Sequence, residues 1–430
     1  MKILVLGSGG REHALSSTFH RQGKQVYCLP GNGGTDVFCE PVEAEWKHIH
    51  LDQHEQLLQF VKEHEIDLVV VGPEAPLENG IVDFFTEHQI NIFGPFREGA
   101  RLESSKARSK AFMDAHHIPT AESVVCNNAQ EAMDAIHRLF PKWKGAVIKP
   151  DGLTGGKGVT ICKTLQEAIT AIDLIMEVGK YGLAGNRVVI EEMLTGPEVS
   201  ILAFCDGNTM VPMIPSQDHK QLHESNTGPN TGGIGAYAPL PFISDEDLEH
   251  IYREIIEKTN EGLLDEGVTY KGVLYFGLMI TDQGPKVLEF NCRFGDPEAQ
   301  VVLPLLESDL AEIMLACING ELAKLPPLRW KPQSACGIVL YSNGYPGEYQ
   351  TGFQISGIEK VLESEDTYIF HSGTKIDADK KLKTAGGRVI TVTALGSSLP
   401  DCVDRAYQGA RNINFEGAAF RKDIASQACK

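Results

Sequence analysis

The chain has 430 residues and carries 58 acidic against 39 basic residues, a formal net charge of −19. It is too long for one ordinary hydrophobic core, so we expect two to four domains. Hydrophobic residues make up 42% and charged residues 23%, as in soluble globular proteins. The acidic balance argues against nucleic acid or an anionic membrane as the main partner. It leaves room for a small anionic ligand held by local Lys and Arg residues.

The ten cysteines are scattered along the chain and form no CxxC pair. Neither a zinc knuckle nor a redox dithiol is therefore indicated. Met1 leads directly into an apolar strand without a secretory signal, and no apolar run approaches ~18 residues. We expect a cytoplasmic protein with reduced thiols and no membrane association.

The first hundred or so residues alternate strands and helices, which predicts a doubly wound parallel sheet. Strands are expected near 2–6, 25–29, 67–71 and 91–93, and helices from about residue 11, at 53–64 and at 78–88. The glycine-rich segment 7–10 predicts a tight turn into a helix, where the glycines could serve packing alone. It is not a full GxGxxG, so a bound ligand would be a sugar phosphate rather than a dinucleotide. Segments 30–34 and 72–76 follow the next strands, at the edge where open α/β sheets bind ligands.

The middle of the chain is a second α/β unit. It is opened by a helix that Ser104 and Ser105 can cap, that carries Lys106, and that ends before Pro119. A smaller part follows, with strands near 123–126, 145–149, 158–162 and 187–192 and a helix at 165–178. Then come strands near 198–205 and 209–214, a long polar loop at 216–237, a helix at 244–266, strands at 272–281 and 286–291, and a helix at 298–319. Pro326 and Pro327 mark a break before a β-rich remainder, with a helix at about 401–413.

Residues 285–298 combine a short apolar strand with charged groups. Every second side chain of a strand faces the same way, so Glu289, Asn291 and Arg293 should project together. Such groups on an apolar strand are costly unless something charged lies among them. Carboxylate and carbonyl oxygens suit Mg²⁺, and a guanidinium suits a phosphate that shares the metal. The pattern predicts a metal–nucleotide site.

Two further segments could bind the nucleotide. A strand delivers Lys149, a glycine-rich loop follows at 152–158, and Lys157 ends it. Two lysines beside such a loop can neutralise a triphosphate, although a hairpin with solvated lysines explains the segment equally. A strand near 188–192 ends in two acids. Glu198 could then hold ribose hydroxyls while the backbone near 191–194 meets an adenine edge; an ordinary solvated strand end is the alternative.

The polar loop at 216–235 is rich in glycine and in groups that bind ligands. Its candidates are Asp218, His219, Lys220 and Asn230. Loops of about 20 residues inside a compact domain are usually functional or disordered, and this density of polar groups favours function.

Together these segments resemble the ATP-grasp ligases, and most closely the phosphoribosylamine–glycine ligases of purine biosynthesis. The resemblance is carried by GSGGREH at 7–13, PGNGGT at 30–35, VGPEAPL at 71–77, GPNTGG at 228–233, EFNCRFGDPE at 289–298 and FRKDI at 420–424. It implies an α/β protein in three parts. These are an N-terminal doubly wound, substrate-binding domain at 1–103, a two-lobed ATP-grasp core at 104–325 with a small lid lobe at about 120–193, and a C-terminal β-rich α+β domain at 326–430.

The resemblance also implies the reaction and its residues. ATP, glycine and 5-phospho-β-D-ribosylamine would give glycinamide ribonucleotide, ADP and phosphate through a glycyl phosphate. Arg293 and Lys149 would be catalytic, and Glu289 and Asn291 would bind Mg²⁺ or Mn²⁺. ATP would contact Lys106, Lys149, Gly156, Lys157, Glu191, Glu192, Leu194 and Glu198. The other substrates would contact Gly9, Gly10, Asn32, Gly33, Glu74, Asp218, Lys220, Asn230 and Asp296.

Three other functions stay open at this point. They are an ATP-grasp ligase or carboxylase for another acid and amine, a catalytically silent nucleotide-binding protein, and a nicotinamide oxidoreductase. The chain departs from the family pattern at Gln221, Glu224 and Asn226 in the polar loop. Its partners are expected to be small molecules alone, and the protein is expected to be a monomer or a weak homodimer.

Overall fold

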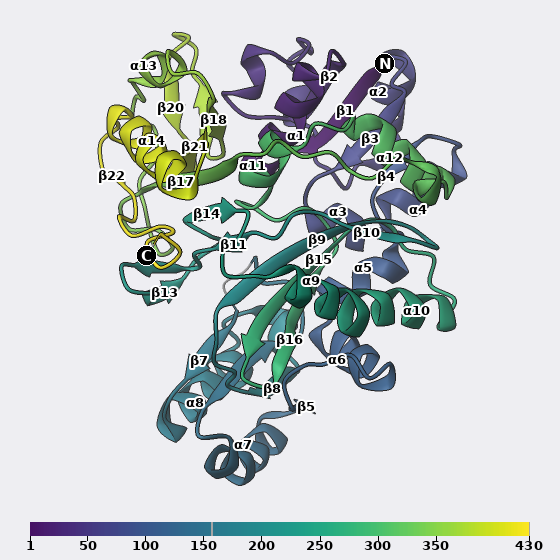
Figure 1. Ribbon diagram of the computed structural model, residues 1–430, viewed down its shortest axis with the longest axis vertical. Helices are drawn as coiled ribbons and strands as arrows, with labels where there is room; N and C mark the ends of the chain where they lie inside the picture. The colour runs from purple at the N-terminus through teal and green to yellow at the C-terminus, as the bar shows by residue number, and fades with distance from the viewer. Residues whose placement is uncertain (156–157, 430) are drawn as a thin grey trace.

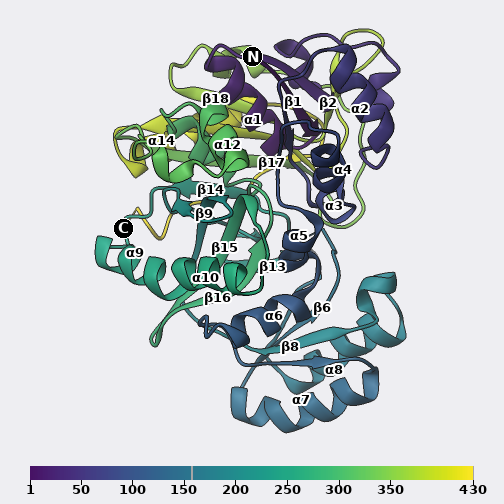
Figure 2. The same cartoon turned by 90° about the vertical axis from the view of Figure 1, so that its right-hand side faces the viewer.

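The structure is a computed structural model that describes residues 1–155 and 158–429. The expected α/β class is confirmed. Figure 1 shows the N-terminal sheet and the C-terminal domain together at one end and the lid lobe at the other, with the large central sheet between them. Figure 2 shows the same order along the long axis. Among the described residues, no helix combines the length and the apolar character needed to span a bilayer.

The N-terminal sheet is entirely parallel. Its order is β2-β1-β3-β4, from β1 (Lys2–Gly7), β2 (Gln25–Pro30), β3 (Leu68–Val71) and β4 (Ile92–Phe93). The unbroken apolar runs in β1 and β3 follow from burial of both faces. After β1 the chain crosses to β2 at one edge of the sheet, and after β3 it crosses to β4 at the other edge. The carboxyl ends of β1 and β3 therefore flank the crevice where open α/β sheets bind ligands. Helices α1 (Gly10–Arg21) and α3 (Glu74–Glu78) begin there.

Two of the longer helices of the structure are absent from the sequence prediction. They are α5 (Arg97–Ser104) and α7 (Ala129–Trp143). The start of α7 has a physical signal, because the Asn128 side chain accepts a hydrogen bond from the Glu131 amide at 2.9 Å. The expected helix at 78–88 is present from Ile81 as α4 (Ile81–Glu87), and the one at 53–64 is α2 (His54–Glu63).

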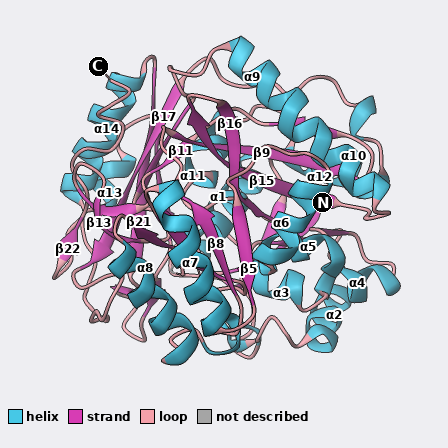
Figure 3. Cartoon of the chain, turned by 90° about the horizontal axis from the view of Figure 1, so that it is seen from below, coloured by secondary structure: helices cyan, strands magenta, loops and turns pink. Residues whose placement is uncertain are grey.

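The lid lobe is a four-stranded antiparallel sheet with its own apolar core. The order is β5-β8-β6-β7, from β5 (Ser123–Cys126), β6 (Ala146–Pro150), β7 (Thr160–Cys162) and β8 (Val188–Glu192). Helices α7 and α8 (Leu165–Ile172) pack on each other and on this sheet, with side chains such as Ile136, Ile148 and Ile190 between them. Figure 3 shows these two helices at the lid end of the molecule.

The central sheet has the order β10-β9-β15-β16 and carries the strand singled out above. Its strands are β9 (Glu198–Asp206), β10 (Met210–Pro212), β15 (Lys271–Thr281) and β16 (Gly284–Asn291). Helices α6 (Lys106–Ala115), α9 (Asp245–Ile251) and α10 (Lys258–Asp265) belong to the same lobe. β16 lies at the edge that faces the lid, where the Val287 amide donates to Pro119 O at 2.8 Å.

The expected polar loop at 216–237 is wrong as a description of the backbone. It contains β11 (Gln217–Asp218), β12 (Gln221–His223), β13 (Thr227–Asn230) and β14 (Gly235–Ala238). β14 pairs with β17 (Ser334–Ser342), which continues through β21 (Arg388–Gly396) to β18 (Thr367–His371). The partner of β14 is so distant in sequence that local residue patterns do not reveal the pairing. The C-terminal sheet thus includes strands from the ATP-grasp part of the chain.

The expected single helix at 298–319 is also wrong. The structure has α11 (Ala299–Val302) and α12 (Leu310–Asn319), with a break between them. Asp309 ends the break, because its side chain accepts hydrogen bonds from the amides of Ala311 and Glu312 at 2.9 and 3.0 Å. The predicted C-terminal helix is α14 (Leu399–Asn412), which packs on β17 and β21 with α13 (Ile358–Leu362) beside it.

Candidate active site

Strand β16 presents a carboxylate and an amide on its site-facing side. Phe290 points the other way and packs edge-on against Phe276, with ring centroids 5.5 Å apart. Glu289 and Asn291 alternate with it and stay partly accessible. Arg293, two residues beyond the strand, donates from Nη2 to Asn291 Oδ1 at 3.4 Å. The three polar side chains expected to project together thus leave the same stretch of chain.

Three lysines from different elements surround Glu289. Lys220 Nζ lies 3.3 Å from Glu289 Oε1 and 3.4 Å from Glu198 Oε2. Lys220 first, and then Lys149 and Lys106, lower the pKa of Glu289 to about 2 against the opposing effect of burial. Glu289 therefore stays ionised throughout the physiological range and is more than neutralised by its neighbours. Such a cluster is suited to a bound polyanion.

Lys149 joins the lid lobe to the central sheet. It lies on β6, and its Nζ donates to Glu191 Oε2 on β8 at 2.9 Å and to Leu288 O on β16 at 3.0 Å. Lys149 is 5% exposed and Glu191 is 2% exposed. The predicted ATP contacts on β6 and β8 therefore lie together at the junction of the two lobes, one residue from Glu289.

The loop after β6 is anchored at the start of α6. Asp151 accepts hydrogen bonds from the Ala107 amide at 2.7 Å and from Arg187 Nε at 2.8 Å. Lys106, at the first position of α6, donates from Nζ to Gly152 O at 3.4 Å. Burial lowers the pKa of Lys106, and Glu289 opposes this effect. The predicted contacts Gly156 and Lys157 lie outside the described residues.

Glu192 and Leu194 lie where the chain leaves the lid lobe. Glu192 Oε1 accepts hydrogen bonds from the Glu122 amide at 3.0 Å and from Lys286 Nζ of β16 at 3.3 Å. Leu194 follows as a half-buried residue between β8 and β9. The side chain of Glu192 thus links the two lobes, and its backbone continues the edge that holds Glu191.

Arg293 is held by two carboxylates of the N-terminal half. Its Nη2 lies 2.8 Å from Glu103 Oε1, and its Nε lies 3.4 Å from Glu74 Oε2. Burial raises the pKa of Glu103, while Arg293 keeps the pKa of Glu74 low despite burial. Glu103 was missed by the sequence analysis. Its signal is the apolar face of α5, where Glu103 follows Gly99 and Ala100 at helical spacing and is buried with them.

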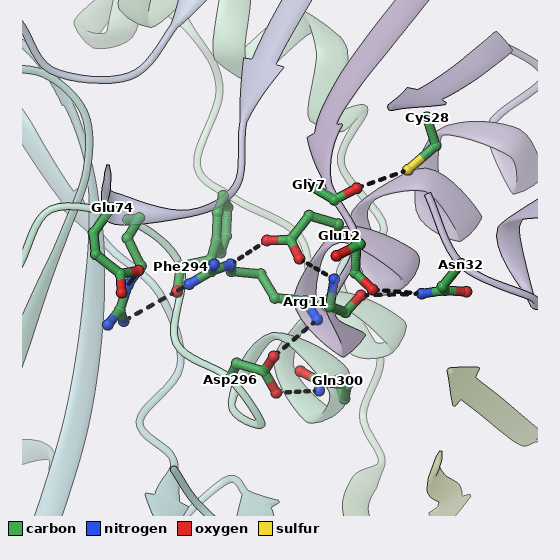
Figure 4. A network of polar contacts seen from close by, with 12 residues as sticks. Gly7, Arg11, Glu12, Cys28, Asn32, Glu74, Phe294, Asp296 and Gln300 are labelled. Atoms are coloured by element: carbon green, nitrogen blue, oxygen red, sulfur yellow. Dashed lines mark hydrogen bonds and ion pairs between the residues drawn. The ribbon is translucent and has the colours of Figure 1, made fainter. Parts of the chain in front are cut away.

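The glycines at the end of β1 make room for a carboxylate. The Gly9 amide donates to Glu12 Oε2 at 2.5 Å, and Arg11 Nε donates to Glu12 Oε1 at 2.6 Å (Figure 4). A Cβ at Gly9 would lie 2.7 Å from Glu12 Oε2, and one at Gly7 would lie 2.5 Å from Glu12 Cγ. Glu12 is not among the site residues predicted from the sequence. One amide of the predicted phosphate cradle already has a protein partner.

Asp296 brings all three parts of the chain to this turn. Its Oδ2 accepts from the Arg11 amide at 3.4 Å, and its Oδ1 accepts from Gln300 Nε2 at 2.7 Å (Figure 4). Arg388 of the C-terminal sheet lies 3.2 Å from Oδ1. Burial raises the pKa of Asp296, but the charges of Arg388 and then Arg11 outweigh this effect. The pKa is therefore below its usual value, and the group stays ionised. A Cβ on Gly9 would lie 3.3 Å from Asp296 Oδ2. Gly9 and Asp296, two of the predicted substrate contacts, are therefore adjacent.

Four other predicted substrate contacts differ in their surroundings. Asn32 Nδ2 donates to Ser8 O and His371 O, both at 2.9 Å, and the Gly33 amide donates to Thr374 O at 3.2 Å. These two residues fasten the C-terminal domain to the β1–α1 turn. The remaining two are Gly10, where a Cβ would lie 2.6 Å from Ser372 Oγ and against Gln300, and Asn230 on the β12–β13 hairpin.

Asp218 has an oxygen with no hydrogen-bond donor among the described residues. This atom, Oδ1, is buried, and burial followed by the nearby Glu298 raises the pKa of Asp218 well above its usual range. Gly233, at φ +103°, is needed here because a Cβ would lie 2.6 Å from Asp218 Oδ1. Glu298, which the sequence analysis missed, accepts from Tyr275 at 2.9 Å and from Ser200 at 3.2 Å. A ligand ammonium at this point would donate to Oδ1, and its positive charge would favour the ionised carboxylate.

The donor set on β16 fits a hard divalent cation. Glu289 and Asn291 offer a carboxylate and a carbonyl oxygen, and Mg²⁺ is commonly held by one or two protein oxygens plus substrate phosphates. Within residues 1–155 and 158–429, no group of three or more His, Cys, Asp and Glu residues could hold a metal ion by itself. The oxygens of Glu289 and Asn291 would fit an ion whose other ligands are phosphate oxygens and water.

Comparisons with known proteins cover nearly the whole chain. Residues 1–103, 104–299 and 335–427 match the N domain, the ATP-grasp (A) domain and the C domain of phosphoribosylglycinamide synthetase. Phosphoribosylamine–glycine ligase of a Nostoc species is 46% identical, over 99% of both chains. The same enzyme of Caldanaerobacter subterraneus subsp. tengcongensis is 43% identical, over 99% of this chain and 100% of the other. The crystal structure of phosphoribosylamine–glycine ligase from Thermotoga maritima superposes with a TM-score of 0.81 at 34% identity, covering 99% and 100% of the two chains.

Proposed function

Since the chain belongs to the phosphoribosylglycinamide synthetase family, we propose that it ligates glycine to 5-phospho-β-D-ribosylamine with ATP, in purine biosynthesis. One observation supports the assignment of its ATP site above the others. The ammonium groups of Lys220, Lys149 and Lys106 converge on Glu289, next to Asn291. This cluster joins a cation site to a polyanion site, which phosphoryl transfer from ATP requires.

The three parts of the chain divide the work in this proposal. Residues 104–325 bind ATP and glycine, with 120–193 as the lid over the nucleotide. Residues 1–103 bind the ribosylamine near Gly9, Glu74 and the loop at 30–34, and residues 326–430 close the site from the other side through Arg388. Bound Mg²⁺ or Mn²⁺, held by Glu289 and Asn291, would neutralise phosphate charge and align the triphosphate.

The first step joins two anions, so the protein must screen charge. A carboxylate oxygen of glycine attacks the γ-phosphorus, and the bond from that phosphorus to ADP breaks, giving glycyl phosphate. Lys149 and Lys106 would neutralise the triphosphate, and Arg293 would stabilise the transferred group. Asp218 would accept the glycine ammonium at its buried Oδ1. No protein nucleophile is required.

The second step consumes the acyl phosphate before water reaches it. The ribosylamine nitrogen attacks the glycyl carbonyl carbon, the carbon–oxygen bond to phosphate breaks, and the departing phosphate takes the amine proton. The β1–α1 turn, Asp296 and Glu74 would orient this amine. The lid lobe, with its separate apolar core, would exclude water during the transfer.

Oxygen transfer tests this reaction path directly. With glycine labelled by ¹⁸O in its carboxylate, one label should appear in each phosphate released in the presence of ribosylamine. Mass spectrometry of the phosphate measures it, and unlabelled glycine in ¹⁸O water is the matched control. Unlabelled phosphate from labelled glycine would contradict the acyl phosphate, and ADP release with other amino acids would favour a different ligase.

Gly9→Ala should weaken the ribosylamine selectively. Gly9 has an ordinary φ of −84°, so alanine brings no backbone strain, but its Cβ would press on Glu12 and Asp296. We expect the KM for ribosylamine to rise roughly tenfold, with the KM for ATP within about twofold of its original value. Steady-state kinetics with each substrate varied in turn measures the difference. An effect confined to ATP would place the ribosylamine elsewhere.

A further inference from the structure

Lys110 is a buried lysine with no part in the ligation steps above. It lies on α6, the last helix before the lid lobe, and is 3% exposed. Its Nζ donates to Thr120 Oγ1 at 2.8 Å and to Ala121 O at 3.3 Å, and it lies 3.4 Å from Glu191 Oε2. Lys110 therefore contacts the chain both where it enters the lid lobe and near where it leaves it.

Glu191 Oε2 is shared by two ammonium groups from different lobes. Lys149 reaches it from the lid strand β6 at 2.9 Å, and Lys110 reaches it from α6. Burial lowers the pKa of Lys110 to about 8; Glu191 opposes this shift, Lys149 adds to it, and Asp114 on the same helix opposes it. One carboxylate faces two cations, so either lysine alone can neutralise it.

A nucleotide changes this balance. A phosphate that attracts Lys149 competes with Glu191 for the same ammonium group. Glu191 is 2% exposed, and a buried charge that loses its only partner is strongly destabilising. Lys110 removes that penalty, because it stays beside Glu191 whichever partner Lys149 takes.

We propose that Lys110 is a positioning residue: it holds Glu191 across the two lobes and so frees Lys149 to bind the phosphates of ATP. The inference rests on the proposed role of Lys149. Lys110 itself does not contact the nucleotide and acts only through Glu191. Its contacts with Thr120 and Ala121 keep it in place at the entrance to the lid lobe.

Equilibrium binding of the Mg²⁺ complex of a non-hydrolysable ATP analogue, followed by calorimetry, tests this role. In Lys110→Met, Lys149 is the only ion-pair partner left for Glu191 among the residues that the structure describes, so the Kd should rise about tenfold. In Glu191→Gln the competing charge is gone. The double variant Lys110→Met/Glu191→Gln should therefore bind within about twofold of Glu191→Gln alone. Lys142→Met, at an exposed lysine of the lid, is the matched control.

If Lys110→Met does not fold, the role of Lys110 can still be tested by comparing the double variant with Glu191→Gln. Neither of these two proteins contains the buried carboxylate of Glu191, so neither can leave it unpaired. A further tenfold loss in the double variant would overturn the inference, as would an unchanged Kd in a folded Lys110→Met. Failure of the wild-type protein to bind the analogue would instead contradict the proposed function.

The pH dependence of the same Kd gives a second readout. Lys110 loses its charge as the pH rises through about 8, and Glu191, Lys149 and Asp114 are the charged groups that face it. The wild-type Kd should therefore increase between pH 7 and 9, and Lys110→Met should lack the component centred near pH 8. Identical profiles for the two proteins would refute the role of Lys110.

Discussion

Glu289→Gln is expected to lower kcat by about 10³-fold, or about 4 kcal/mol in activation free energy. The substitution keeps the shape of the side chain but removes the charge that three lysines surround. A neutral amide is a weaker ligand for Mg²⁺, and Lys220 then loses one of its two carboxylate partners. Steady-state assays of ADP release with all three substrates measure the loss.

The fold should survive this change. The side chain of Glu289 is 30% exposed, so water can solvate the new amide and the neighbouring ammonium groups. Circular dichroism and the thermal midpoint should stay close to those of the original protein. Glu249→Gln is the matched control and should retain full activity, because Glu249 lies on α9 in an exposed ion pair with Arg253. Near-normal turnover of Glu289→Gln would refute the metal assignment.

Lys149→Met should raise the KM for ATP about 100-fold while leaving the KM for glycine within about threefold of its original value. Methionine keeps the unbranched chain of lysine apart from the terminal ammonium group, so the variant removes mainly the charge. The ammonium group lies between Glu191 and Leu288 O at the junction of the lobes, where the triphosphate is proposed to bind.

Stability should fall only modestly in Lys149→Met. Breaking a buried ion pair commonly costs about 3–5 kcal/mol, but Lys110 remains 3.4 Å from the same Glu191 oxygen. Urea denaturation measures this cost. Lys142→Met is again the control, because that lysine is 63% exposed in its side chain. Equal effects on ATP and glycine would count against the assignment of Lys149 to the nucleotide.

Patterns with a short period could be predicted from the sequence. The alternation around Phe290 located β16 and the side on which Glu289 and Asn291 lie. The apolar runs of the first sheet and the cap at Ser105 likewise placed β1, β3 and α6 close to their observed limits. These features depend on neighbours within a few residues, which is why local physical chemistry identifies them.

Features that depend on distant partners could not be predicted in this way. β14 is a strand because β17, about a hundred residues later, pairs with it. The start of α12 is different: its cap at Asp309 is a local signal that the prediction of one helix over 298–319 overlooked. The buried carboxylates of the site divide in the same way. Glu103 looks like an ordinary helix residue until the fold places Arg293 against it. Glu12 is a local case, because it accepts from the amide of Gly9 three residues earlier at the start of its own helix.

The two lobes also explain why Glu191 has more than one possible role. From the sequence it is the end of a strand, where the backbone could meet an adenine. In the structure its side chain is buried between Lys149 and Lys110, while its backbone remains part of β8 at the lobe junction. A contact of the backbone with ATP and a contact of the side chain with the lysines are compatible.

The most direct test of the proposed metal–nucleotide site is the position of the metal in a crystal grown with Mn²⁺ and a non-hydrolysable ATP analogue. The anomalous signal of manganese locates the ion without reference to the surrounding atoms. We expect the manganese peak to lie within bonding distance of oxygens of Glu289, Asn291 and the bound phosphates. A triphosphate whose metal lies far from both side chains would contradict it.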